Sequence, residues 1–310
     1  MQNIPRDGTS RVKEMFSSRF GADGRIVEVD YSALEVVALA AISGDKNLMA
    51  QLIAGTDMHC YRLAGKLGES YEYVFEKCHN KDHPDHKLYK QLRTDIKPQA
   101  FANQYGASAQ GIAYATGCTV EDAEKFQETE RHLFPESAMF AEKVVRPEVE
   151  RTGLDNVSRE QRDDGTFGIY RTGRFKAKGG TEYSFRQYEK RVDGQLVMDY
   201  KDTQLANYWC QGEASFIVQA ACGRVIRMLL SEDFAGGKVL PVNTVHDAIY
   251  LDCATPELAK EYGAKVRDLM EATPAYLCEL MPNYKDWRYD TTPFPAAAEM
   301  GVNMMNKTDI

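Results

Sequence analysis

Several features common in nucleic-acid coat proteins, secreted proteins and membrane proteins are scarce in this sequence of 310 residues. Its net charge is −8, so it lacks the basic excess of a general nucleic-acid coat, although an acidic surface can still surround a locally basic cleft. Seven cysteines are scattered without a Cys-x-x-Cys pair, which indicates free thiols in a reducing cytosol and predicts a cytoplasmic protein. No signal-peptide pattern opens the chain and no apolar run reaches membrane-spanning length, so we expect no membrane partner.

The first two thirds of the chain change periodicity several times. Residues 25–29 are apolar and β-branched and predict a strand that leads into Asp30. A helix rich in alanine, leucine and valine follows over residues 33–43. Residues 56–147 are largely helical in pattern, whereas turn residues and aromatics predict hairpins over residues 150–200.

The last third begins with a second long helical pattern, over residues 203–231. Two apolar runs follow, at residues 239–245 and 249–253, and together they predict a β-hairpin with Asp247 at its tip. The tail after Trp287 is rich in turn residues, and we expect no catalytic group there.

Arg93, Lys97, Phe101 and Tyr105 are spaced four residues apart. Each such step on an α-helix rotates by only about 40°, so the four side chains would form one stripe roughly 18 Å long. Its basic end coincides with the positive end of the helix dipole, which suits a nucleoside triphosphate with its phosphates there and its base and sugar beside the aromatics. An ordinary amphipathic helix is the alternative. Because Pro98 interrupts the pattern, the helix could also begin only at Lys97.

Three motifs occur along the chain in a fixed order: Asp30-Tyr31-Ser32-x-x-Glu35, then Arg93-x3-Lys97-x3-Phe101-x3-Tyr105-Gly106, then His246-Asp247. In order and chemistry they resemble motifs A, B and C of the family A DNA polymerases. Gln2-Asn3-Ile4-Pro5 and Asn207-x3-Gln211-Gly212 extend the resemblance over nearly the whole chain.

The resemblance implies an α+β fold in which an antiparallel-sheet palm carries both aspartates. A helical fingers subdomain would be inserted between them, in a right-hand polymerase fold that lacks a thumb. The expected parts are a first palm segment at 1–50, fingers at 51–200 with a basic hairpin insertion at about 150–200, and a second palm segment at 201–310. Between residues 159 and 191, nine lysines and arginines oppose five acids, so this insertion could contact the template; a solvated hairpin face is the alternative.

By the same resemblance, Asp30 and Asp247 hold two Mg²⁺ ions, and the backbone carbonyl of Tyr31 completes a ligand set. Two carboxylates are the minimum for clamping two hard cations about 3.5–4 Å apart. A single aspartate at a strand end is usually a turn or cap residue, so this interpretation depends on the pair. Motif C of the family continues with glutamate where Ala248 stands here, so one secondary carboxylate is missing. We expect catalysis to survive because the two main ligands remain.

The resemblance also assigns the incoming nucleotide to the stripe. Arg93 and Lys97 would bind its phosphates together with His59, and Lys97 is a candidate proton donor to pyrophosphate. Phe101 would lie against the sugar. Tyr105 would stack near the template–primer terminus and move as the fingers close.

Other residues would select the sugar and hold the DNA. Glu35 matches a position that leaves no room for a ribose 2′-hydroxyl, which makes the substrate a dNTP. Asn207 and Gln211 would hydrogen-bond in the minor groove near the primer terminus and so check pair geometry without reading sequence. His246 would support the primer-terminal phosphate, and Gly106 would also lie at the DNA.

Family members place a thumb, and often a 3′–5′ exonuclease domain, before the Gln2-Asn3-Ile4-Pro5 segment, whereas here Met1 directly precedes it. We therefore expect a split polymerase of a phage type, with those parts on a separate polypeptide. Its partners would be primer–template DNA, dNTPs and that polypeptide, and the acidic chain alone would bind DNA weakly. A catalytically impaired DNA-binding or replisome subunit is the alternative. A single-subunit RNA polymerase conflicts with Glu35.

One further segment carries metal-ligand residue types. Cys78-His79-x3-His83-x2-His86 contains the thiol and imidazole groups that bind zinc. Its spacing is irregular and no second cysteine pair follows. A polar loop of the fingers is therefore the favoured interpretation, with a zinc site as the alternative.

Overall fold

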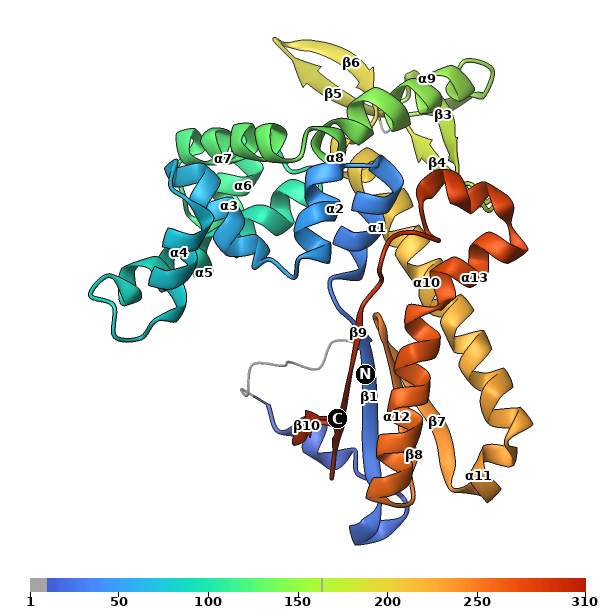
Figure 1. Cartoon of the computed structure of the whole chain (residues 1–310). Helices are drawn as coiled ribbons and strands as arrows, with labels where there is room; N and C mark the ends of the chain where they lie inside the picture. The colour runs from blue at the N-terminus through green and yellow to red at the C-terminus, as the bar shows by residue number, and fades with distance from the viewer. Residues whose placement is uncertain (1–9, 163) are drawn as a thin grey trace. The chain divides into compact units, whose positions relative to one another are not determined.

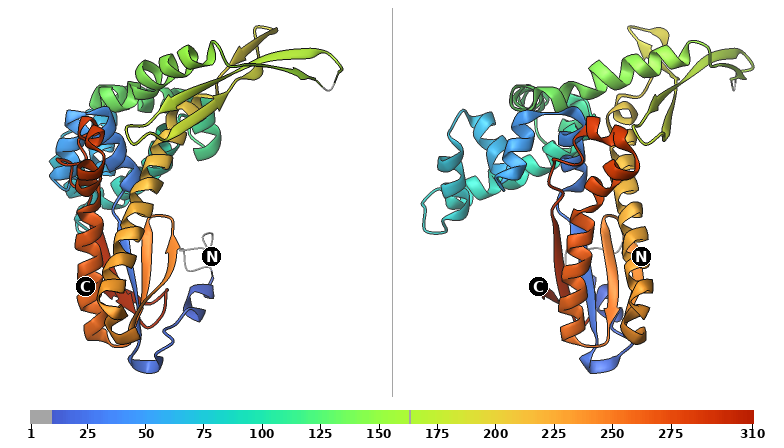
Figure 2. Two further views of the ribbon diagram at one scale, coloured as in Figure 1. Left: turned by 90° about the vertical axis from the view of Figure 1, so that its right-hand side faces the viewer. Right: turned by 45° about the vertical axis from the view of Figure 1, so that its right-hand side comes forward.

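A computed structural model describes residues 10–162 and 164–310, and the Gln2-Asn3-Ile4-Pro5 segment lies outside the described residues. The chain divides into two compact units (Figure 1 and Figure 2). Unit 1 comprises Met1–Ala38 and Gly212–Ile310, and unit 2 comprises Leu39–Gln211. Unit 1 is built on an antiparallel sheet and unit 2 is mostly helical, which confirms the predicted α+β fold class.

Unit 1 contains a five-stranded antiparallel sheet in the order β10-β9-β1-β8-β7. The strands are β1 Arg25–Tyr31, β7 Val239–Val245, β8 Ala248–Cys253, β9 Ala296–Gly301 and β10 Lys307–Asp309. Every residue of β8 is buried, and so is most of β1, because both faces of the central strands are covered. The predicted first strand and the predicted hairpin are both confirmed.

The sequence did not predict strand β9, which pairs with β1 along its whole length. The expectation of a turn-rich tail after Trp287 was therefore incomplete. The strand begins Ala296-Ala297-Ala298, and alanine has little intrinsic preference for strands. The open edge of β1 supplies the backbone partners that the local sequence does not signal. This pairing also sets Glu299 opposite Glu28.

Helix α12, Pro256–Glu271, packs against the sheet after an N-cap at Thr255, whose side chain accepts a hydrogen bond from the Leu258 amide. The helix approaches β1 closely at Gly263, where an added Cβ would lie 3.3 Å from a methyl group of Val27. The other helical segments of unit 1 are η1 Val12–Met15, η2 Gly21–Asp23, α11 Asp233–Gly237, α13 Thr273–Leu280 and η4 Pro282–Trp287.

Helices α1, Leu34–Ser43, and α10, Asp202–Ser231, contribute residues to both units, and both were predicted. By length and composition alone, α10 could cross a membrane. The helix mixes apolar, small and polar residues, so it contains no uninterrupted apolar run of membrane-spanning length, as predicted. Core helices of folded proteins pass the same test. Inside unit 1, Arg224 of α10 donates hydrogen bonds to the Leu269 carbonyl at 3.1 Å and the Thr273 hydroxyl at 3.0 Å.

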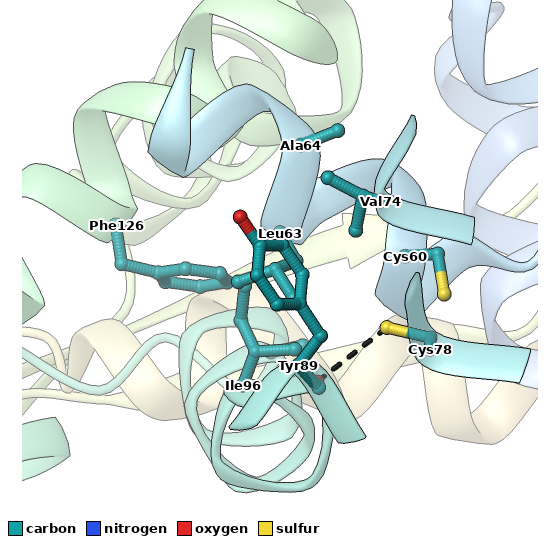
Figure 3. Close-up of a cluster of buried hydrophobic side chains, with 9 residues drawn as sticks. Cys60, Leu63, Ala64, Val74, Cys78, Tyr89, Ile96 and Phe126 are labelled. Atoms are coloured by element: carbon teal, nitrogen blue, oxygen red, sulfur yellow. Dashed lines mark hydrogen bonds between the residues drawn. The ribbon is translucent and has the colours of Figure 1, made fainter. Parts of the chain in front are cut away.

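Unit 2 consists of helices, as predicted for residues 56–147, followed by hairpins. Its helical segments are α2 Lys46–Ile53, α3 Met58–Leu67, α4 Tyr71–His79, α5 His86–Gln104, α6 Ala109–Thr116, α7 Val120–Leu133, α8 Pro135–Phe140, η3 Ala141–Val145 and α9 Arg146–Gly153. A buried cluster joins α3, α4, α5 and α7 (Figure 3). Its residues are Cys60, Leu63, Ala64, Val74, Cys78, Tyr89, Ile96, Ala100 and Phe126.

The hairpins of unit 2 contain the basic segment, and three of its arginines form ion pairs with acids of the same segment. Their strands are β2 Val157–Gln161, β3 Phe167–Lys176, β4 Glu182–Arg186, β5 Tyr188–Val192 and β6 Gln195–Asp199. Arg162 pairs with Glu189 at 2.6 Å, and Arg174 pairs with Glu182 at 3.2 Å. Arg186 pairs with Glu160. Because Glu160, Glu182 and Glu189 are among the five acids already counted, the segment keeps its excess of four positive charges, and the template contact and the solvated hairpin face both stay predictions.

A buried ion pair in unit 2 gives a stability prediction. Arg62 Nε donates to Glu130 at 2.9 Å, and both side chains are less than a tenth exposed. Arg62→Met leaves the carboxylate buried without its partner and should destabilise unit 2 by about 3–5 kcal/mol. The check is urea unfolding followed by Trp209 fluorescence in a Trp287→Phe background, because Trp209 is the tryptophan of unit 2.

The matched control for this pair is the double variant Arg62→Met with Glu130→Leu. It removes both charges and should recover most of the lost stability, since replacing a whole buried pair by apolar groups is often neutral. Equal losses in the single and double variants would contradict the explanation.

Candidate active site

The two predicted metal-binding aspartates lie on adjoining strands of unit 1. In the register of β1 with β8, Asp30 pairs with Ala248. The next amide, that of Tyr31, donates to the carbonyl of Asp247 at 3.4 Å. Paired residues on antiparallel strands have Cα atoms about 4.5–5.5 Å apart. The fold therefore brings the two residues together from opposite ends of the chain.

The Tyr31 side chain anchors this end of β1. Its ring is buried, and its hydroxyl donates to the backbone carbonyl of Met270, in α12, at 2.6 Å. Burial raises the pKa of the Tyr31 hydroxyl, which keeps it a neutral donor. The backbone carbonyl of Tyr31, the predicted third ligand, thus belongs to a residue held by both the sheet and a helix.

A pocket of about 340 Å³ lies beside Asp30, on the face of β1 that Glu28 shares. Its lining residues are Lys13, Glu28, Asp30, Ala297, Glu299, Met304, Met305, Lys307 and Asp309. Lys307 forms ion pairs with Glu28 and, at 2.6 Å, with Glu299. Glu28, Glu299 and Lys307 were not among the predicted site residues. Strands β9 and β10 bring Glu299 and Lys307 here, and no local pattern predicts those strands.

Ala248, where the family carries a glutamate, is fully buried. It packs in an apolar cluster with Ile26, Val245, Tyr250 and Met304. At the position of the family's secondary carboxylate, this chain therefore has a methyl group packed in the apolar core. A glutamate at this position would have to enter that cluster.

The tip of the β7–β8 hairpin is His246-Asp247, as predicted. His246 is exposed with φ +54°, a left-handed conformation that histidine adopts more readily than most residues. Glu35 lies in the first turn of α1 and is half-buried.

In unit 2, the predicted stripe lies on α5. The helix runs through Pro98, so the alternative in which it begins only at Lys97 is wrong. Arg93, Lys97 and Phe101 are helical, and Tyr105 is the C-cap residue. Phe101 is 51% exposed, which argues against the alternative of two core aromatics on an ordinary amphipathic helix.

Asp57, which was not predicted as a site residue, holds the basic end of the stripe. Arg93 donates to Asp57 Oδ2 from Nε at 2.8 Å and from Nη2 at 2.7 Å. The other oxygen, Oδ1, caps α3 by accepting from the amides of His59 and Cys60. Burial would raise the pKa of Asp57, but the hydrogen bonds from Arg93 and the Cys60 amide lower it to about 2. An N-cap aspartate was the one local signal of its importance.

His59 lies beside the stripe, with its ring centroid 6.4 Å from that of Phe101 in an edge-on arrangement. Burial, together with the nearby cations Arg62 and Arg93, lowers the pKa of His59 to about 4. The ring is therefore neutral near pH 7. A neutral imidazole ring can still donate one hydrogen bond.

Asn207 and Gln211 lie on α10, four residues apart; Asn207 is half-buried and Gln211 is exposed. Gly106 follows the stripe with φ +74° and contacts the start of α10. A Cβ at Gly106 would lie 2.7 Å from Ala206 Cβ and 2.9 Å from the Asp202 carbonyl. Close packing thus accounts for this glycine, whatever its role at DNA.

The predicted alternative zinc set of Cys78, His79, His83 and His86 does not converge among the described residues. Cys78 is buried and its thiol donates to the Tyr89 carbonyl at 3.4 Å. His83 Nδ1 accepts from the Asp85 amide at 3.1 Å. Residues 80–85, between the end of α4 and the start of α5, form a polar loop, as favoured. All seven cysteines are free, as predicted.

The sequence and the fold were compared with those of known proteins. The sequence model of DNA polymerase family A matches residues 1–285, so the chain belongs to DNA polymerase family A. It is 27% identical over 274 residues to DNA polymerase I of Lactococcus lactis, covering 87% of this chain and 26% of that protein. A DNA polymerase of Mycobacterium phage D29 is 26% identical over 128 residues, covering 41% and 18%.

Among solved structures, the fold is similar to the POL domain of Pol1 from M. smegmatis, in complex with DNA primer-template and dNTP. The TM-score is 0.62 at 18% identity, covering 98% of this chain and 44% of that one. The similarity confirms the polymerase-type fold. The chain spans about a quarter of the length of the DNA polymerase I of Lactococcus lactis, at 26%.

The packing of Gly106 gives a second stability prediction. Gly106→Ala adds both the strain of a left-handed alanine, about 1–2 kcal/mol, and a clash with α10. Gly117→Ala is the matched control, since Gly117 has φ +75° with nothing within 4 Å of an added Cβ. We expect the loss in unfolding free energy at Gly106 to exceed that at Gly117 by about 1–3 kcal/mol. Equal losses would remove the argument from close packing.

Proposed function

We propose that this chain carries the palm and fingers of a DNA-directed DNA polymerase, with the palm at residues 1–50 and 201–310 and the fingers at 51–200. It would transfer a nucleotide from a dNTP to a primer 3′-hydroxyl, directed by a template. The observation that carries the proposal is the register of β1 with β8, which puts Asp30 beside Asp247. Membership of DNA polymerase family A over residues 1–285 supports the reaction class.

The residues present fit a pair of Mg²⁺ ions. Asp30, Asp247 and the Tyr31 carbonyl offer oxygen donors, which hard cations prefer, at one end of two paired strands. Bound there, the ions would lower the pKa of the 3′-hydroxyl and neutralise the departing pyrophosphate. With Ala248 in an apolar cluster, the ligand set rests on the two aspartates.

The stripe on α5 supports a triphosphate substrate. Asp57 accepts from Nε and Nη2 of Arg93 and so orients the guanidinium, which would bind a phosphate oxygen through its remaining N–H groups. Lys97, one turn further along the helix, would add a second cation and a proton for the leaving pyrophosphate. The exposed Phe101 ring offers a flat surface for the sugar, and Tyr105 would stack near the primer terminus.

DNA binding is assigned to Asn207, Gln211, His246 and Gly106. With a net charge of −8, the chain alone should hold DNA weakly. The candidate for that task is a separate polypeptide with a thumb and a 3′–5′ exonuclease. A catalytically impaired DNA-binding subunit remains the second candidate, favoured by the burial of Ala248.

Primer extension with Mg²⁺ and dNTPs separates the two candidates. Asp30→Ala and Asp247→Ala should each lower the rate by at least about 1,000-fold, because several kcal/mol of charge stabilisation are lost. Asp23→Ala, at an exposed acid of η2, is the control and should extend normally. Primer–template binding without any extension, even with a polypeptide carrying a thumb supplied, would favour the impaired subunit.

Sugar selection is tested at Glu35. Glu35→Ala should raise NTP use relative to dNTP use by about 10- to 200-fold, the range that one small steric contact provides. Glu35→Gln keeps the side-chain volume and should keep the selectivity. Competitive incorporation of paired nucleotides measures both. If wild type uses NTPs as well as dNTPs, the assignment of Glu35 is wrong.

A further inference from the structure

Three different metal-ligand groups converge in unit 2, where the start of α3 lies beside the end of α4. Asp57 is the N-cap of α3, Cys60 lies three residues later, and His79 is the last residue of α4. Their ligand atoms all lie within 4.8 Å of one another. None of the three belongs to the proposed Mg²⁺ ligands, which lie in unit 1.

Two of the separations between ligand atoms are close to those of a tetrahedral zinc site. Zinc bonds of about 2.0–2.3 Å to nitrogen, oxygen and sulfur place neighbouring ligand atoms about 3.3–3.7 Å apart. His79 Nε2 lies 3.2 Å from Asp57 Oδ2 and 4.0 Å from Cys60 Sγ. Shifts of a few tenths of an ångström in side chains would bring these two separations into that range.

The ligand groups are held in place without a metal. The Asp57 carboxylate is fixed by the amides of His59 and Cys60, at 3.0 and 3.1 Å. The His79 ring stacks on Phe75, with centroids 4.3 Å apart, which orients its Nε2. Cys60 is fully buried, and Figure 3 shows its sulfur near that of Cys78 at the edge of the core cluster.

We propose that Asp57, Cys60 and His79 bind one Zn²⁺ ion. A thiolate with an imidazole selects zinc over magnesium, which prefers oxygen donors. His79 is about half exposed, so water can complete the fourth position. On binding, the Cys60 thiol gives its proton to solvent and the sulfur bonds to the metal. The alternative zinc set predicted from the sequence joined His79 to its neighbour Cys78, whereas in the fold the thiol closest to being a ligand beside His79 Nε2 is that of Cys60.

The metal would share its carboxylate with Arg93. Asp57 Oδ2 accepts from Arg93 as well as facing His79 Nε2, so the guanidinium and the metal compete for one oxygen. This competition predicts that removing the positive charge of Arg93 strengthens zinc binding. A chance cluster that binds no metal would give no such gain.

The test is zinc titration of the whole chain, prepared metal-free, against a chromophoric chelator. We expect one zinc per chain. Cys60→Ser and His79→Gln should each weaken affinity by more than about 100-fold, beyond the usual effect of a supporting residue. Arg93→Gln should strengthen it at least about tenfold. Co²⁺ substitution should give a thiolate charge-transfer band that Cys60→Ser removes.

Matched controls come from the same unit. Cys118→Ser and His132→Gln change the same residue types away from the cluster and should leave affinity unchanged. Circular dichroism establishes that each variant is folded, and the half-exposed His79 makes His79→Gln the variant least able to disturb the core. The proposal fails if the chain takes up no stoichiometric zinc, or if Cys60→Ser and His79→Gln bind it as wild type does. If the wild-type chain binds zinc but extends no primer, that result would count against the proposed polymerase function and not against the zinc site.

Discussion

The antiparallel pairing of β1 with β8 is the constraint on which the candidate active site depends. Asp30 and Asp247 are far apart in sequence, and one strand register makes them neighbours. A slip of one residue would turn Asp30 to the opposite face of the sheet. Tyr31, hydrogen-bonded to α12, and β9 on the other side of β1 both resist such a slip. The buried central strands thus fix the positions of Asp30 and Asp247 relative to each other.

In unit 2 a single carboxylate has a comparable role. Asp57 caps α3, holds Arg93 and faces His79, so it links three elements at the basic end of the stripe. If nucleotide phosphates and a zinc ion both use this region, as proposed, each would change the electrostatic field that the other meets. The electrostatic field at the basic end of the stripe would then depend on whether Asp57 holds the Arg93 guanidinium or a metal ion.

Local sequence patterns predicted the elements that form through interactions between residues near each other in the sequence. The β7–β8 hairpin, the helix over residues 203–231 and the helices of residues 56–147 follow from periodicity and turn residues. The α5 stripe was predicted too, although local rules made Pro98 a reason to shorten the helix. What failed depends on distant partners. Strand β9 needs the edge of β1, and the Asp57–Arg93 pair needs α3 against α5. Cys60 meets His79 only because α3 packs on α4.

The end of the chain has a consequence for the acidic pocket. Lys307 reaches Glu28 and Glu299 from the short strand β10, and Ile310 donates its amide to the Ala298 carbonyl. The positive charge that offsets two carboxylates next to Asp30 is therefore attached by a strand of three residues. Fraying of that strand would leave like charges facing each other beside the proposed metal ligands. The electrostatic field around Asp30 would thus depend on whether this short strand stays paired with β9.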